Sequence, residues 1–232
     1  MVYIIADNAA DFKKGDYVSA AFTEVDPPAT EGGPLIIRAE ELRRDGLYDK
    51  PVIYLYPETA TVCSVKVTLD GYLTCTYPAH GAEGWQDFTA YPDGTLIFPD
   101  GSSYYCLYWE GRNASDFDFS SGFCVRGSDT AAFLADILPR LGLTAREANE
   151  FIIYWLPQMQ DAPYNVISFQ TEAYTDMAKL EITPAPDTLL RVFMAFYPSE
   201  EAVDIPAQEI TPCQRQGFTV VEWGGSQVDG QE

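Results

Sequence analysis

Carboxylates are the side chains of this 232-residue chain whose spacing most suggests chemistry. Asp116 and Asp118 flank Phe117, and on an extended segment the two acids point to one face, about 6.5–7 Å apart. Such a pair suits a bound cation or the acid and base of a hydrolase. The same alternation is typical of a half-buried edge strand with Phe117 and Phe119 turned inward, and we favour that interpretation.

Two glutamates complete the set of candidate catalytic residues. Glu150 and Tyr154 are four residues apart in a predicted helix, so they share a face and suit an acid or base in a pocket. They also fit a boundary position, where a tyrosine buries its ring and hydrogen-bonds at its tip. The candidate catalytic carboxylates are Glu110, Asp116, Asp118 and Glu150.

A second set of candidates is aromatic and lies between Lys50 and Gly111. Flat rings near acids and amides suit stacking on sugars, whereas rings at strand spacing usually pack a core. Adjacent strand residues point to opposite faces, so neither the pair Tyr104-Tyr105 nor the pair Tyr108-Trp109 can share one core layer. Either the sheet is covered on both faces or one aromatic row is exposed and can bind a ligand. The candidate binding residues are Trp85, Tyr91, Tyr105 and Trp109.

Several familiar chemistries lack the residues they need. His80 is the only histidine, so no zinc-finger spacing exists, and a lone loop histidine is most often idle. The chain contains no GxSxG elbow, no P-loop and no GxGxxG. Its five cysteines form no CxxC pair, and their odd, unpatterned number favours free thiols over a disulfide framework. We therefore expect no metal and no cofactor.

The composition limits the partners and the compartment. A net charge of −21 repels phosphate backbones, so nucleic acid and anionic lipid are poor partners, while cationic partners are allowed. No apolar run approaches the roughly 18 residues of a membrane span. The six-residue apolar run before Asp7 is too short for a signal-peptide core, so the chain is expected to be cytoplasmic, or exported if a leader was removed.

Short strands are expected to position the aromatic candidates. Turns at Asp70-Gly71, Pro92-Asp93-Gly94 and Pro99-Asp100-Gly101 predict a β-meander in which Tyr72–Tyr77 returns along Val62–Leu69. Thr23–Pro34 is interpreted as a linker or long loop, and Glu40–Gly46 as a short polar turn or a single helical turn. The predicted strands of this half are Leu35–Ala39, Val52–Tyr56, Val62–Leu69, Tyr72–Tyr77, Phe88–Tyr91, Thr95–Phe98 and Tyr104–Trp109.

Beyond Gly127 the hydrophobic period changes from 2 to 3.6. Ser128 is expected to cap a helix that runs to about Leu138. Thr144 to Glu147 form a capping box for a second helix, about Ala145 to Leu156, which Pro157 should stop. Together they predict an αα-hairpin. The later strands are predicted at Val166–Phe169, Lys179–Thr183, Leu189–Tyr197 and Phe218–Trp223.

These elements predict an α+β protein: a β-rich meander or sandwich followed by a helix hairpin packed on further strands. The apolar helix faces require a sheet to bury against, so the two parts can share one core. The expected division is 1–49 as N-terminal extension and linker, 50–127 as β-rich region, 128–225 as α+β region, which can form one continuous domain with 50–127, and 226–232 as polar tail.

Five segments of the chain resemble a family of uncharacterised bacterial proteins. They are KPVIYLYPE at Lys50–Glu58, TAYPDGTL at Thr89–Leu96, LYWEG at Leu107–Gly111, NEFIIYWLPQM at Asn149–Met159 and GFTVVEWGG at Gly217–Gly225. The resemblance spans roughly 50–225 and implies no activity, cofactor or catalytic residue. Many similar proteins look exported or surface-associated, whereas this sequence shows no leader.

The favoured hypothesis is a non-enzymatic binding or interaction module for glycan or peptide at the cell envelope. It rests on the row of aromatics and on the lack of a catalytic motif. The alternative is a carboxylate-based hydrolase, which requires two of the candidate acids to converge in a cleft. An assembly scaffold is a third possibility. The expected partner is a carbohydrate or a protein, and the oligomeric state is open.

Overall fold

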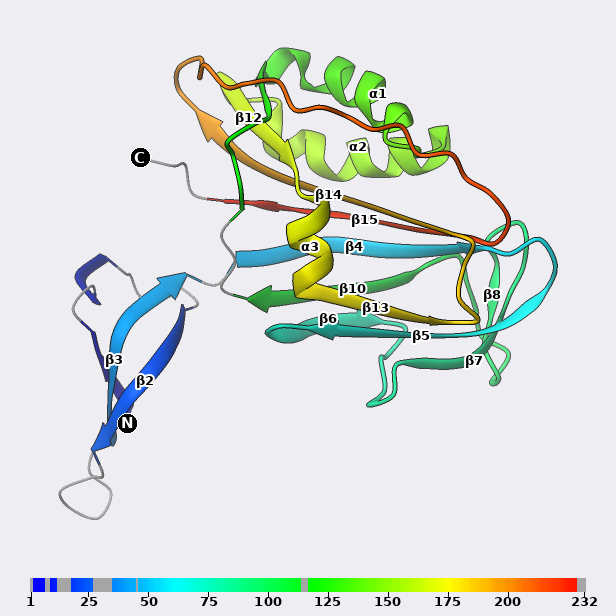
Figure 1. The fold of residues 1–232 in the computed structure, drawn as a ribbon, viewed down its shortest axis with the longest axis horizontal. Helices are drawn as coiled ribbons and strands as arrows, with labels where there is room; N and C mark the ends of the chain where they lie inside the picture. Colours follow the sequence, from blue (N-terminus) through cyan, green and yellow to red (C-terminus); the bar gives the residue numbers. More distant parts are fainter. Residues whose placement is uncertain are drawn as a thin grey trace.

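The computed structural model describes residues 2–6, 9–11, 18–26, 35–44, 46–113 and 117–228. Strands and helices are mixed in these residues, and a helix pair packs against strands, so the predicted α+β class is confirmed. Figure 1 shows α1 (Thr130–Arg140) and α2 (Ala145–Met159) side by side, and the short α3 (Thr171–Met177) apart from them.

The largest sheet, called here the large sheet, has seven strands in the order β11-β12-β14-β15-β4-β10-β6. Its neighbours are antiparallel except for β14 and β15, which are parallel. Strands from before and after residue 128 lie side by side in it, since β15 pairs with β4. The strands are β11 (Phe123–Arg126), β12 (Tyr164–Phe169), β14 (Thr188–Ser199), β15 (Thr219–Gln227), β4 (Gly46–Tyr56), β10 (Leu107–Asn113) and β6 (Tyr72–Tyr77).

Two further sheets accompany it (Figure 1). The facing sheet has the order β13-β5-β7-β8-β9 and packs on one face of the large sheet. The N-terminal sheet has the order β1-β3-β2. The strands of the facing sheet are β13 (Ala178–Thr183), β5 (Thr61–Leu69), β7 (Trp85–Ala90), β8 (Leu96–Ile97) and β9 (Ser103–Tyr104). Those of the N-terminal sheet are β1 (Val2–Ile5), β3 (Leu35–Arg44) and β2 (Val18–Asp26).

The helices α1 (Thr130–Arg140) and α2 (Ala145–Met159) form the predicted hairpin, and a short α3 (Thr171–Met177) links β12 to β13. Two short 3-10 turns, η1 (Ala9–Asp11) and η2 (Gly127–Asp129), complete the described elements. The capping box at the start of α2 is confirmed, because the Thr144 and Glu147 side chains each bond the other residue's backbone. Both helices bury an apolar stripe, which requires a sheet beneath it.

The central strands of the large sheet are buried on both faces. One face meets the facing sheet across the sheet–sheet core, which includes Trp85, Trp109 and Phe193. The other face meets α1 and α2 across the sheet–helix core, which includes Trp155 and Trp223. Every residue from Leu190 to Tyr197 in β14 is buried, as expected of a strand that has no solvent face.

The predicted pairing of β5 with β6 is wrong. The chain does turn at Asp70-Gly71, but it passes there from one sheet to another, so β6 pairs with β10 while β5 pairs with β7 and β13. A turn motif reports a local change of direction, whereas the pairing partner depends on which sheet buries each strand. The backbone N–H of Asp70 donates to the carbonyl of Met177 at 2.8 Å, which ties the turn to the end of α3.

Other predicted boundaries also need correction. The single strand expected at Tyr104–Trp109 is broken into β9 and β10. At the break the chain passes from the facing sheet, which contains β9, to the large sheet, which contains β10. The turn expected at Glu40–Gly46 is mostly strand, because β3 runs to Arg44 and β4 begins at Gly46. Of the expected linker, Thr23–Asp26 belongs to β2, and 27–34 lies outside the described residues.

Helix ends differ from the predictions as well. Asp129 and not Ser128 is the N-cap of α1, and it makes no side-chain capping bond. Pro157 lies inside α2, which continues to Met159. A proline so near the end of a helix removes only one of the last backbone hydrogen bonds, so the helix tolerates it.

Candidate functional site

A cleft of about 600 Å³ opens where β4, β9, β10 and the end of β6 meet α2. Its volume lies within the range of small-ligand sites in proteins. Most of its lining is aromatic: five tyrosines line it together with Lys50, Val52, Ser103 and Cys106. We call it the tyrosine cleft, and its tyrosines are Tyr77, Tyr104, Tyr105, Tyr108 and Tyr154.

Strand alternation brings the aromatic row of β10 to this cleft. Trp109 is 0% exposed, lies in the sheet–sheet core and donates its Nε1–H to Glu222 at 2.9 Å. Its neighbour Tyr108 points to the opposite face, packs on the sheet–helix core and lines the cleft. The prediction that Tyr108 and Trp109 occupy different layers is therefore confirmed. One row is sealed between two sheets, and the other reaches a surface hollow.

Tyr104 and Tyr105, at the break between β9 and β10, are divided only in part, because both line the cleft. Tyr104 also packs against the sheet–sheet core, whereas Tyr105 is 54% exposed. The guanidinium of Arg146, on α2, lies 5.5 Å from the centre of the Tyr105 ring. The cleft thus has an exposed ring at its rim, and α2 supplies a cation beside that ring.

Two tyrosine hydroxyls bind carboxylates beside the cleft. Tyr54 donates to Glu150 at 2.5 Å, and Tyr108 donates to Glu110. Burial raises the pKa of both phenols well above the ordinary value, and the hydrogen bonds to the carboxylates raise it further. Both phenols therefore remain protonated donors at neutral pH. Glu150 also accepts from Arg146 at 3.2 Å, so its charge is partly balanced.

Burial also lowers the reactivity of the Cys106 thiol, which lines the cleft. Burial, followed by the negative charge of Glu150, raises the pKa of Cys106 to about 11. Only the thiolate is a strong nucleophile, so Cys106 does not suit nucleophilic catalysis at neutral pH.

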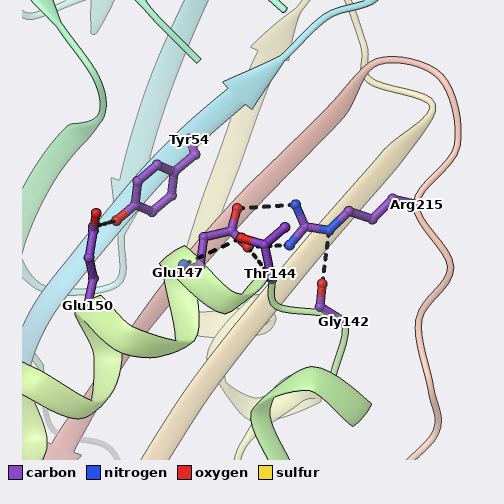
Figure 2. A network of polar contacts seen from close by, with 6 residues as sticks. All are labelled: Tyr54, Gly142, Thr144, Glu147, Glu150 and Arg215. Atoms are coloured by element: carbon purple, nitrogen blue, oxygen red, sulfur yellow. Dashed lines mark hydrogen bonds and ion pairs between the residues drawn. The ribbon is translucent and has the colours of Figure 1, made fainter. Parts of the chain in front are cut away.

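A polar network fixes the helix that forms one wall of the cleft (Figure 2). Thr144 donates its backbone N–H to the Glu147 carboxylate at 2.8 Å. Arg215, from the segment before β15, bonds both Glu147 oxygens and donates to the Gly142 carbonyl at 2.9 Å. The C-terminal segment and the helix loop are thereby tied together. This anchoring sets the position of Glu150 and Tyr154 further along α2.

The buried Glu147 is charged because of these partners. Burial by itself would raise its pKa, but the bonds from Arg215 and from the Thr144 backbone outweigh burial and hold the pKa below its ordinary value. The side chain is 1% exposed, so its charge depends on Arg215 for compensation.

The structure places the candidate carboxylates in different regions. Glu110 accepts from Tyr108, which lines the tyrosine cleft, and Glu150 lies near enough to Cys106 of the lining to raise the pKa of that thiol; neither carboxylate is itself part of the lining. Asp118 lines a separate hollow of about 320 Å³ with Ser168, Gln170 and Gln208, and its carboxylate accepts from Ser120. Asp116 lies outside the described residues.

Residues 117–120 do not form the expected edge strand, although their side chains alternate between buried and exposed as that interpretation requires. Phe117 and Phe119 are buried in the sheet–sheet core, while Asp118 is exposed. The Gln170 side chain donates to the Asp118 carbonyl at 2.7 Å and accepts from its backbone N–H at 3.2 Å. These two hydrogen bonds satisfy the buried Gln170 amide, so its burial has a structural explanation.

The candidate binding aromatics are also divided. Tyr105 lines the tyrosine cleft, and Tyr91 is 38% exposed but is not part of the cleft lining. Trp85 and Trp109 are 1% and 0% exposed in the sheet–sheet core and offer no surface to a ligand. Trp85 donates its Nε1–H to the Pro78 carbonyl at 2.8 Å, and the ring of His80 packs edge-on against it.

Sequence reasoning did not single out Lys50, Tyr54 or Arg215 for the site. Tyr54 alternates with Ile53 and Leu55, which is a detectable sign that it lies on the other face of β4. Lys50 and Arg215 carry no local signal, because a bulge and a distant segment bring them to their places.

Three more findings bear on the site. Within the described residues, no helix is both long and apolar enough to cross a bilayer. The same part of the chain holds no group of three or more His, Cys, Asp or Glu side chains placed to bind a metal ion. Comparison of the chain with protein-family models, curated proteins and solved structures finds no match.

Proposed function

We propose that this protein is a non-enzymatic binding module whose tyrosine cleft takes a carbohydrate. The observation that carries the proposal is the lining of the cleft, in which five tyrosines surround a hollow of about 600 Å³. Rings of this kind present flat apolar faces to sugar C–H groups, and their hydroxyls supply hydrogen-bonding tips.

The polar groups beside the rings suit a ligand rich in hydroxyls. The carboxylates of Glu110 and Glu150 can each accept a further hydrogen bond beside the one from a tyrosine. Lys50 in the lining and Arg146 beside the Tyr105 ring add hydrogen-bond donors. A cleft that combines flat rings with both donors and acceptors matches a sugar better than a purely apolar ligand.

The carboxylate-based hydrolase remains the alternative, favoured by the presence of Glu110 and Glu150 beside one cleft. Each of these acids is engaged by a tyrosine hydroxyl, and Asp118 lies in a different hollow. Incubation with each bound oligosaccharide, followed by a reducing-end assay, distinguishes the two functions. A binding module releases no new reducing ends, whereas release that is abolished by Glu110→Gln or Glu150→Gln supports the hydrolase.

The binding experiment uses a glycan array followed by calorimetric titration of the oligosaccharides that bind. Tyr105→Ala and Tyr108→Ala should each weaken binding by about tenfold, which is the loss of one aromatic contact of roughly 1.4 kcal/mol. Tyr91→Ala is the matched control, because Tyr91 is a partly exposed tyrosine outside the cleft. If no glycan binds while an extended peptide binds and depends on Tyr105, the ligand class is a peptide.

The location at the cell envelope is part of this proposal. It is supported by the resemblance to a bacterial family in which many members look exported or surface-associated. Fractionation of the source cells, with an antibody against the protein, tests it directly. Recovery only in the cytoplasmic fraction would contradict the envelope location and leave carbohydrate binding untouched.

A further inference from the structure

Lys50 has an unusual backbone conformation. Its φ of 56° lies in the left-handed region, which only one other non-glycine residue of the described chain, Asp87, adopts. A lysine pays a steric penalty there that a glycine avoids. Strained positions of this kind are concentrated at functional sites, so the conformation calls for an explanation.

A β-bulge explains how the conformation arises. Val52 lies opposite Trp223 and Asp49 lies opposite Gly225, so two residues of β4, Lys50 and Pro51, face the single Gly224. The pairing of β4 with β10 shifts at the same place. A bulge bends its strand and redirects a side chain, and bulges are frequent beside binding sites.

The redirected side chain lines the tyrosine cleft. The Lys50 ammonium lies 5.2 Å from the centre of the Tyr154 ring. None of the ion pairs among the described residues includes Lys50. Acids outnumber bases by 35 to 14 in this chain, so a lysine that contacts a ring in place of a carboxylate is notable.

The two acids beside the cleft already have other partners. Glu150 accepts from Tyr54 and Arg146, and Glu110 accepts from Tyr108. Lys50 is therefore the cation of the cleft lining that is left to meet a charged group of a ligand.

We propose that Lys50 makes the tyrosine cleft selective for acidic carbohydrate, namely a glycan that contains uronic acid. The sugar carboxylate pairs with the Lys50 ammonium while the sugar ring lies against the tyrosines. A charge-assisted hydrogen bond in a half-buried cleft is stronger than a neutral one. This inference rests on the proposed carbohydrate function and names its ligand class.

The test compares matched ligands that share their sugar rings and differ at the carboxylate, which is either charged or a neutral methyl ester. The probes are trimers of galacturonate, glucuronate and mannuronate, and the corresponding methyl esters, which keep the sugar rings and remove the carboxylate charge. Calorimetry with the intact protein should show that at least one acid trimer binds about tenfold or more tightly than its ester. The preference should weaken at high salt, because screening reduces the attraction between the charges.

Variants at Lys50 separate the role of its charge from the stability of the fold. Lys50→Gly suits the left-handed backbone and should fold with an unchanged or higher Tm. It should bind the acid and the ester equally, at the ester affinity of the wild type. Lys50→Arg keeps the charge and should retain part of the preference for the acid. The control is Lys179→Ala, which removes a lysine on β13 that does not line the cleft.

The outcomes are distinguishable. Equal binding of acid and ester by the wild type would overturn the role of Lys50 and leave carbohydrate binding intact. A preference that survives in Lys50→Gly would show that another residue supplies it, and would equally overturn the inference. If none of the trimers or their esters binds and the glycan array is also blank, the proposed carbohydrate function itself fails.

Discussion

The two faces of the large sheet bear the same kind of polar pair in different surroundings. On the sheet–sheet face, the Trp109 Nε1–H donates to Glu222, and both side chains are fully buried. On the sheet–helix face, Tyr54 and Tyr108 donate to Glu150 and Glu110, which are only partly buried.

The difference lies in what covers each face. The facing sheet encloses Glu222, whose second oxygen accepts from Arg191 at 2.6 Å. Both carboxylate oxygens of Glu222 therefore bond to neighbouring side chains of the protein. The helix hairpin leaves a hollow of about 600 Å³ beside the other pairs. An aromatic donor bound to a carboxylate is therefore a structural unit where the cover is complete, and part of a candidate site where the cover ends.

The largest effect is expected on the enclosed face. Arg191→Met leaves the Glu222 carboxylate, which is 0% exposed, without its cation, and should cost about 3–5 kcal/mol of unfolding free energy. Urea denaturation followed by tryptophan fluorescence measures the loss. The double variant Arg191→Met/Glu222→Met should recover part of it, because no charge is left unpaired. A loss below about 1 kcal/mol in the single variant would show that the enclosed pair is not stabilising in this way.

The next effect concerns the anchor of α2. Arg215→Met removes the cation beside Glu147 and should cost about 1–3 kcal/mol at neutral pH. The folded-state pKa of Glu147 lies below its ordinary value, so its contribution is present at neutral pH and is lost as the pH falls through that lowered pKa. The stability difference between wild type and Glu147→Gln should therefore shrink on acidification. A difference that grows at low pH would contradict this sign.

A smaller effect is expected at the half-open face. Tyr54→Phe removes one hydrogen bond to Glu150, which keeps Arg146 as a partner, and should cost about 0.5–1.5 kcal/mol. Tyr105→Phe is the matched control because its ring is 54% exposed, and it should change stability by less than about 0.5 kcal/mol. Thermal unfolding of both variants measures the difference. Equal losses would remove the contrast between buried and exposed tyrosines within the site.

The smallest change is chemical and leaves the fold untouched. Because the pKa of Cys106 is raised to about 11, iodoacetamide at pH 7.5 should modify the exposed Cys75 and spare Cys106. Peptide mass spectrometry over a pH series should show Cys106 reacting faster as the pH approaches its pKa. Equal rates of the two cysteines at pH 7.5 would show that Cys106 is more open to solvent than the structure indicates.

Much of the local structure was predictable. The capping box at Thr144 follows from a four-residue pattern, and the buried stripe of α2 follows from its period. The pairing of β6 was not predictable, because the Asp70-Gly71 turn is compatible with either a hairpin or a passage between sheets. Pairing depends on contacts between residues far apart in the chain, which no local pattern reports.

The candidate site shows the same limit. Tyr105 and Glu150 were candidates because residue type and spacing pointed to them; Tyr105 lines the tyrosine cleft, and Glu150 lies beside it, near Cys106. Trp85 and Trp109 had equal claims by type but lie in the core. Lys50 was overlooked because a left-handed bulge without glycine leaves no mark in the sequence.

The sequence by itself determined that adjacent aromatics of β10 point to opposite faces, because strand geometry alternates side chains whatever surrounds them. It also determined the helix hairpin and the lack of nucleotide-binding motifs. Only the tertiary structure decided which aromatic row is sealed and which borders a cleft. The physical reason is that alternation is a local property of the backbone, whereas coverage depends on where a second sheet and the two helices end.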